Sequence, residues 1–64
     1  MELTDIISTI RSYTHKEIND IKIHIYPPYH YKIDVRVEGR RNWIKTGLKN
    51  SIEECLTSLK FQLG

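Results

Sequence analysis

The sequence predicts an α+β fold of order α-β-β-β-α, a three-stranded antiparallel sheet with both helices packed on one face. Apolar residues recur at steps of three and four near both ends of the chain, and at every second position between them. Pro27-Pro28, Gly39 and Gly47 divide the middle into segments of strand length. Ten of the 64 residues are Ile and none is Ala, and such branched side chains favour a pleated sheet.

The first segment is predicted to be a helix whose pattern ends between Thr14 and Asp20. Glu2 and Asp5 would lie in its first turn, where negative charge favours the positive end of the helix dipole. Steps of three and four place the apolar side chains on one stripe of the helix. The members of that stripe are Leu3, Ile6, Ile7, Ile10 and Tyr13.

Alternation with a period of two predicts three strands in the middle of the chain. The first covers 21–26 and ends at Pro27-Pro28, because proline cannot donate to a ladder of hydrogen bonds. The second follows as the alternating run 31–38. Gly39-Arg40 is predicted to form a two-residue hairpin turn, and the third strand covers 41–46.

The predicted register places apolar residues of neighbouring strands on the same face of the sheet. A five-residue loop over 26–30 sets the first hairpin, and a register shifted by two residues remains an alternative. The inner pairs are then Ile23 with Ile33, Ile21 with Val35, and Val35 with Ile44. The outer neighbours are Lys22 and Asp34, His24 and Lys32, Asp34 and Lys45, Arg36 and Trp43, and Glu38 and Arg41.

A second helix is predicted to begin near Asn50 or Ser51, after Gly47 ends the third strand. Either Asn50 with Glu53 or Ser51 with Glu54 has the spacing of a capping box. The apolar stripe of this helix comprises Ile52, Cys55, Leu56, Leu59 and Leu63. Because each helix must bury its stripe, we expect both to cover the same apolar face of the sheet and to leave the other face open.

The open face is the surface on which function is expected. It would display Lys22, His24, Tyr26, Lys32, Asp34, Arg36, Glu38, Arg41, Trp43 and Lys45. Positive charge gathers in the same part of the chain, since residues 22–49 contain seven Lys or Arg and two Asp or Glu, net +5. The remainder contains three cations and six anions, net −3, and the two parts sum to the +2 of the whole chain.

This distribution of charge favours nucleic acid as the partner, with DNA as the first expectation and a small regulator or accessory factor as the role. Cations would contact phosphates, while the interleaved aromatic rings would stack on bases or accompany Arg insertion into a groove. The predicted nucleic-acid-binding residues are Lys22, Lys32, Arg36, Arg40, Arg41, Trp43 and Lys45.

A protein-binding adaptor or inhibitor is the alternative function. It would use the same face and an aromatic, proline-rich loop, with Tyr26, Pro27, Pro28, Tyr29, Tyr31 and Trp43 as the contact residues. Two edge strands and an uncovered face also allow a homodimer. A third interpretation is a merely solvated face, on which Asp34 and Glu38 form ordinary cross-strand ion pairs and Arg36 covers Trp43.

The segment from Tyr31 onward loosely resembles the three-stranded DNA-binding domains of plant APETALA-type factors and the arm-binding domains of phage integrases. The likeness lies in YKIDVRV at 31–37, GRR at 39–41, WIKTG at 43–47 and SIEE at 51–54. It is an architectural analogy that covers about half of the chain and leaves out the first helix. The resemblance implies that Arg36, Arg41, Trp43 and Lys45 read the major groove.

No catalytic, metal or cofactor site is predicted, and the chain is not expected to be an enzyme. It contains no nucleophile elbow, no phosphate-cradling glycine loop and no converging pair of carboxylates. A single domain of residues 1–64 is also expected to lack a pocket of the usual ~300 Å³. His15, His24, His30 and Cys55 do not have the spacing of a zinc motif.

Cysteine usage and hydropathy bear on the compartment. One Cys cannot form an internal disulfide, which favours a reducing compartment, and we expect the protein in the cytoplasm. The chain has no run of about eighteen apolar residues and no basic-then-apolar leader, so no membrane partner is expected.

Overall fold

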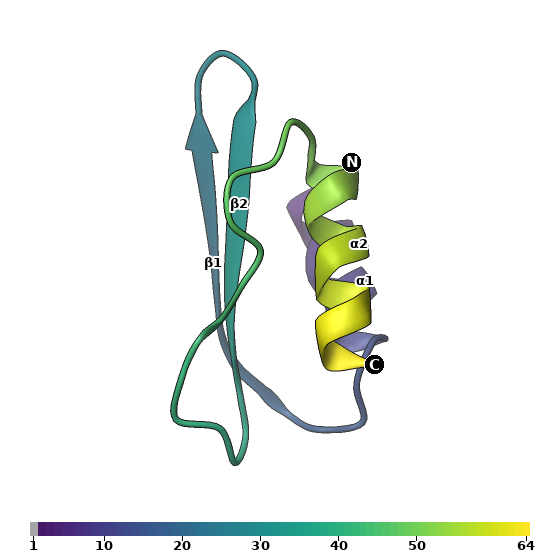
Figure 1. Cartoon of the computed structure of the whole chain (residues 1–64). Helices are drawn as coiled ribbons and strands as arrows, with labels where there is room; N and C mark the ends of the chain where they lie inside the picture. Colours follow the sequence, from purple (N-terminus) through teal and green to yellow (C-terminus); the bar gives the residue numbers. More distant parts are fainter. Residues whose placement is uncertain (1) are drawn as a thin grey trace.

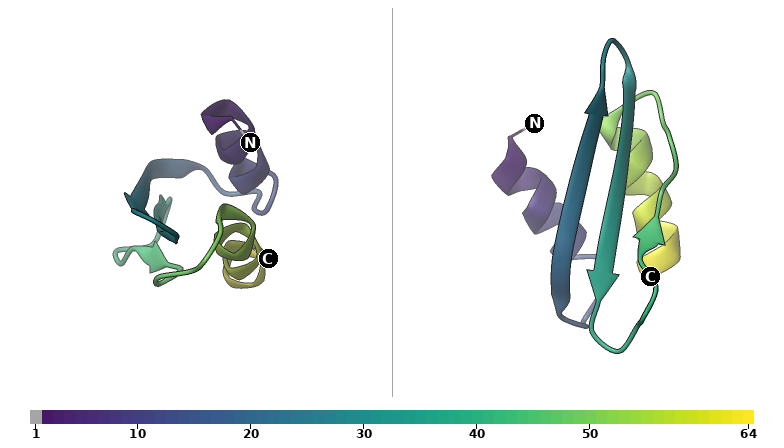
Figure 2. Two further views of the ribbon diagram at one scale, coloured as in Figure 1. Left: turned by 90° about the horizontal axis from the view of Figure 1, so that it is seen from above. Right: turned by 90° about the vertical axis from the view of Figure 1, so that its left-hand side faces the viewer.

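The elements follow the order helix, three antiparallel strands, helix (Figure 1). A computed structural model describes residues 2–64, so Met1, the first residue of the predicted domain, lies outside the described residues. The elements are α1 (Leu3–Arg11), β1 (Ile18–Tyr26), β2 (His30–Val37), β3 (Ile44–Lys45) and α2 (Ile52–Leu63). The strand order is β1-β2-β3, and both helices lie on the same side of the sheet (Figure 2). The predicted fold class is confirmed.

Each helix buries part of the apolar stripe that its periodicity indicated. Ile6 and Ile10 of α1 are buried, whereas Leu3 at its start remains exposed. In α2 the hydroxyl oxygen of Ser51 accepts a hydrogen bond from the Glu54 N–H at 3.2 Å, so the predicted Ser51 cap is confirmed. The shared core consists of Ile6, Ile10, Ile33, Val35, Val37, Ile44, Cys55, Leu56 and Leu59.

The register of β1 against β2 is the one that the alternation predicted. Ile23 pairs with Ile33 and Ile21 with Val35, so the alternative shifted by two residues is wrong. The ladder is longer than expected at both ends. Tyr26 pairs with His30, which shortens the turn to 27–29. At the other end β1 begins at Ile18, and a bulge lies between Ile18 and Asp20.

The second hairpin differs from its prediction in the turn and in the length of β3. Its register is correct, since Val35 pairs with Ile44 and Asp34 with Lys45. The predicted two-residue turn at Gly39-Arg40 is wrong, because Arg40 donates its N–H to the Val37 carbonyl at 3.1 Å and 38–43 form a loop. Gly39 has a φ of +84°, the left-handed conformation that glycine adopts without strain.

Thr46 continues the ladder after β3 has ended. Its backbone N–H donates to the Ile33 carbonyl at 3.1 Å, and its hydroxyl oxygen accepts from the Ile33 N–H at 3.0 Å. The side chain thus does what a backbone carbonyl would do in a regular strand. The hydroxyl itself donates to the Gly47 carbonyl at 2.8 Å, so this buried group is fully used.

Within residues 2–64, none of the helices combines the length and the apolar character that crossing a bilayer requires.

Candidate nucleic-acid interface

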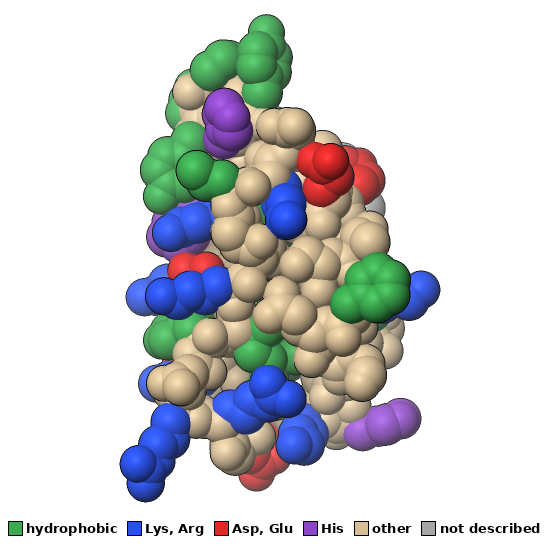
Figure 3. Space-filling view, in the orientation of Figure 1, with side chains coloured by type: hydrophobic (Ala, Val, Ile, Leu, Met, Phe, Trp, Pro, Cys, Tyr) green, Lys and Arg blue, Asp and Glu red, His purple; other side chains and the backbone are tan. Residues whose placement is uncertain are grey.

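Four of the predicted contact residues share the face of the sheet that the helices leave open. Ile33, Val35 and Ile44 point into the core, and strand alternation therefore turns their neighbours to the opposite face. These neighbours include four cations: Lys22 on β1, Lys32 and Arg36 on β2, and Lys45 on β3. Figure 3 shows the result as Lys and Arg side chains along the left margin of the molecule, over the sheet.

Trp43 lies against two of these four cations, Lys22 and Arg36. The side chain is half-buried just before β3. The Lys22 Nζ atom lies 4.6 Å from the centroid of its ring, and the Arg36 guanidinium carbon lies 5.6 Å from it. Both distances are within the range of cation–π attraction. The expected contact of Arg36 with Trp43 is confirmed, whereas the reach of Lys22 from β1 was not predicted.

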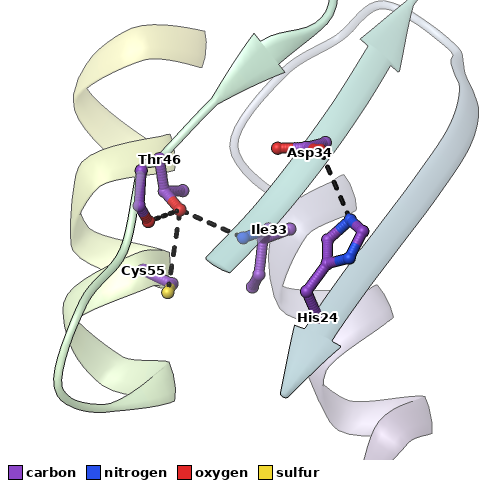
Figure 4. Close-up of polar contacts among 6 residues, drawn as sticks. His24, Ile33, Asp34, Thr46 and Cys55 are labelled. Atoms are coloured by element: carbon purple, nitrogen blue, oxygen red, sulfur yellow. Dashed lines mark hydrogen bonds and ion pairs between the residues drawn. The ribbon is translucent and has the colours of Figure 1, made fainter. Parts of the chain in front are cut away.

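The largest correction to the predicted interface concerns the ion-pair partner of Asp34. Its strand neighbours are Lys22 and Lys45, as expected, yet among residues 2–64 it forms an ion pair with neither. The carboxylate instead lies 3.4 Å from His24 Nε2 (Figure 4), and the residue is only 8% exposed. Lys22 is drawn away because its ammonium group lies over Trp43. The negative charge of Asp34 is therefore covered rather than displayed.

The second anion on this face was missed by the sequence prediction. Asp20 forms an ion pair with Arg36, and both side chains are about half exposed. Such a surface pair is weak, about 0–1 kcal/mol, and a phosphate could compete for the guanidinium. Extension of the predicted register toward the start of β1 would have identified Asp20, since it pairs with Arg36 in the ladder.

Arg40 and Arg41 do not belong to the ladder of the open face. Both are exposed in the loop 38–43, because β3 starts only at Ile44. The predicted pair of Glu38 with Arg41 is not part of the β2–β3 ladder, whose pairs are Asp34 with Lys45 and Val35 with Ile44. The Glu38 N–H donates to the Glu17 carbonyl at 2.9 Å. The two arginines therefore extend the positive charge beyond one end of the sheet.

The aromatic residues of the first hairpin divide between the two faces. Tyr29 is 70% exposed at the tip and Tyr26 is 44% exposed. The rings of Tyr26 and His24 are stacked, with centroids 6.3 Å apart and planes 11° from parallel. Tyr31 instead packs against the core on the helix side, so the aromatic set predicted for a protein partner does not form one continuous surface.

Cys55 is a structural residue of the core. It is fully buried, and its thiol donates to the Tyr31 carbonyl at 3.5 Å. Burial raises the pKa of the Cys55 thiol, an effect that its hydrogen bond with Thr46 and the charge of Lys49 partly oppose. Across residues 2–64 no group of three His, Cys, Asp or Glu side chains could hold a metal ion.

The surface of residues 2–64 contains two hollows larger than the size of the chain predicted. One of about 500 Å³ lies along α2 and is lined by Lys49, Glu53, Glu54, Thr57 and Ser58. Another of about 330 Å³ is lined by Arg11, His15, Lys16, Glu17 and Ile18. The expected absence of a ~300 Å³ pocket is therefore wrong. Both hollows lie outside the open face.

Comparisons of the chain with protein-family models, with curated proteins and with solved structures give no match. The interface is therefore interpreted from its own geometry. Of the four residues that the resemblance to three-stranded DNA-binding domains implicated, Arg36, Trp43 and Lys45 lie together, and Arg41 lies in the adjoining loop.

Proposed function

We propose that this protein binds nucleic acid through the open face of its sheet, with DNA as the first substrate to test. The observation that supports it is the arrangement of charge on that face. Four cations project from three adjacent strands, while the central carboxylate, Asp34, is covered. Asp20 offsets one of these four charges, and a polyanion approaching the face still meets a net positive charge. Neutralised phosphates release their counterions. The role that we propose is that of a small regulator or accessory factor.

Lys45→Ala is expected to weaken DNA binding severalfold at low salt and to lower its salt dependence. Lys45 is exposed beside Asp34, so its loss removes one phosphate contact without disturbing the core. Each contact to duplex DNA changes the slope of log Kobs against log salt by about 0.9. Fluorescence anisotropy of a labelled duplex, titrated between about 50 and about 200 mM salt, measures both quantities.

Lys60→Ala is the matched control, because Lys60 is an exposed lysine on α2, outside the open face. Lys60→Ala should leave the affinity for DNA and the slope of log Kobs against log salt unchanged. Equal losses in the two variants would mean that binding follows net charge alone. Failure of the wild-type protein to bind any nucleic acid at low salt would refute the proposed function.

Asp34→Asn is expected to tighten binding about twofold at low salt. The change removes a negative charge beneath the cations, and a unit charge at ~8 Å from a phosphate in a medium like water contributes about 0.5 kcal/mol. The gain should fade as salt screens it. Asp5→Asn is the control, since Asp5 is exposed on α1. Unchanged or weaker binding by a folded Asp34→Asn protein would contradict the description of Asp34 as a covered opposing charge.

A protein-binding adaptor is the second candidate, and the exposed hairpin tip favours it. Tyr29 and Ile25 are 70% and 66% exposed, next to the stiff Pro27-Pro28 segment. A rigid apolar tip can bind a protein with little loss of conformational freedom. Recovery of one defined protein partner after nuclease treatment would support this candidate, and a homodimer is the special case in which that partner is a second copy.

A further inference from the structure

The open face changes in character toward the tip of the first hairpin. Near its middle it presents the cations around Trp43, whereas at the tip Tyr26 lies opposite His30 and His24 lies opposite Lys32. Tyr26 and His24 occupy alternate positions of β1, so their side chains leave the same face of the strand. Their rings are stacked and nearly parallel, and they form an aromatic pair beside the cations.

Trp43 is less suited to contact a base than the aromatic pair of Tyr26 and His24. Its ring already has the Lys22 ammonium group and the Arg36 guanidinium group placed against it. Tyr26 is 44% exposed, and within residues 2–64 the cation–π contacts involve the Trp43 ring and not that of Tyr26. Since stacking needs an aromatic surface that a base can reach, we assign the base-contacting role to the Tyr26 and His24 pair.

We infer that the open face takes a single strand of nucleic acid in preference to a duplex. This inference rests on the proposed function and specifies its substrate. Phosphates would lie along Lys22 and Lys32, and a base would stack on Tyr26. In a duplex the flat faces of the bases are occupied by their neighbours, whereas a single strand offers them to aromatic side chains. An exposed ring at the end of a row of cations is therefore of greatest use on a single strand.

The test compares Tyr26→Leu with wild type on three labelled probes. The probes are oligo-dT and oligo-rU of about twelve nucleotides, within the site size of small single-strand binders, and a hairpin duplex with the same number of phosphates. Wild type should bind the tighter of the two single strands at least about tenfold better than the duplex. Tyr26→Leu should lose about tenfold on that strand, because stacking contributes about 1–3 kcal/mol per base. Its duplex binding should not change.

Two further variants separate stacking from changes in folding or surface. Tyr26→Phe keeps the ring and should keep wild-type affinity. Phe61→Leu makes the same kind of change at an aromatic residue of α2 that is 83% exposed, and should have no effect. The comparison of oligo-dT with oligo-rU shows whether the preferred strand is DNA or RNA.

The outcomes distinguish this inference from the proposed function. Duplex binding as tight as single-strand binding would overturn the inference while the proposed function stands. Retention of full single-strand affinity by Tyr26→Leu, or equal loss in Phe61→Leu, would also overturn it. An absence of binding to all three probes at low salt would overturn both.

Discussion

Leu59→Ala is expected to lower the free energy of unfolding by about 2–5 kcal/mol. Leu59 is fully buried in α2, and nine of the described residues 2–64 form the core to which it belongs. Its truncation leaves a cavity that neighbouring branched side chains cannot fill without leaving their rotamers. A chain of 64 residues has a stability near the lower end of the usual ~5–15 kcal/mol. The substitution would therefore remove most of the free energy of unfolding. Urea denaturation followed by circular dichroism measures the change.

Leu48→Ala provides the comparison for the same chemical change at the surface. Leu48 is 60% exposed, so its truncation should alter the free energy of unfolding by no more than about 0.5 kcal/mol. Similar losses in the two variants would mean that the core is not where the structure places it. Because α2 supports the sheet, Leu59→Ala should also weaken nucleic-acid binding, but only in proportion to the unfolded fraction.

Thr46→Val is expected to destabilise the protein by about 1–3 kcal/mol, although the two side chains have nearly the same shape. The hydroxyl oxygen of Thr46 is the acceptor for the Ile33 N–H (Figure 4), and both residues are buried. Valine would leave that N–H without a partner away from water. Because Thr46 follows Lys45 and anchors the end of β3, the variant should also loosen the cation at position 45.

Thr57→Val is the matched control for this loss of a hydroxyl group. Thr57 is exposed on α2, and its hydroxyl donates to the Glu53 carbonyl, a group that already lies within the helix. We expect a change of no more than about 0.5 kcal/mol, measured by thermal unfolding of both variants side by side. If Thr46→Val were as stable as Thr57→Val, the side chain of Thr46 would not be acting as a strand partner.

The register of the sheet could be predicted because slippage by one residue would reverse its faces. Ile21, Ile23, Ile33 and Val35 can share the core in few ways, and the structure contains the predicted pairs. The composition of the open face follows from the same alternation. Lys22, Lys32, Arg36 and Lys45 were therefore predictable as neighbours on that face, before any side-chain position was known.

The turn and the third strand could not be predicted from alternation, because hydrogen bonds between segments distant in the sequence decide them. Gly39-Arg40 has the composition of a two-residue turn, but Glu38 bonds to Glu17 and the chain turns one residue earlier. Thr46 then replaces a strand carbonyl with its hydroxyl, which no propensity scale describes. β3 is two residues long as a result.

The burial of Asp34 depends on contacts that cross more than one strand. Sequence neighbours and ladder partners indicated Lys22 and Lys45 as its ion-pair partners. The attraction of Lys22 to Trp43, which belongs to neither the same strand nor its neighbour, leaves His24 as the partner. Side-chain competition of this kind is settled by three-dimensional packing, and a one-dimensional pattern does not contain it.

Trp43 holds two cations of the open face, Lys22 and Arg36, in place in the absence of a ligand. A Lys or Arg side chain that becomes immobilised only when its ligand binds loses rotational freedom. This loss costs about 0.5–1.5 kcal/mol of binding free energy for each side chain. Lys22 and Arg36 already rest against the indole ring, so part of this entropy is lost during folding rather than during docking. For the proposed nucleic-acid ligand, Lys22 and Arg36 would be preorganised, and Trp43 would raise the affinity without touching the ligand.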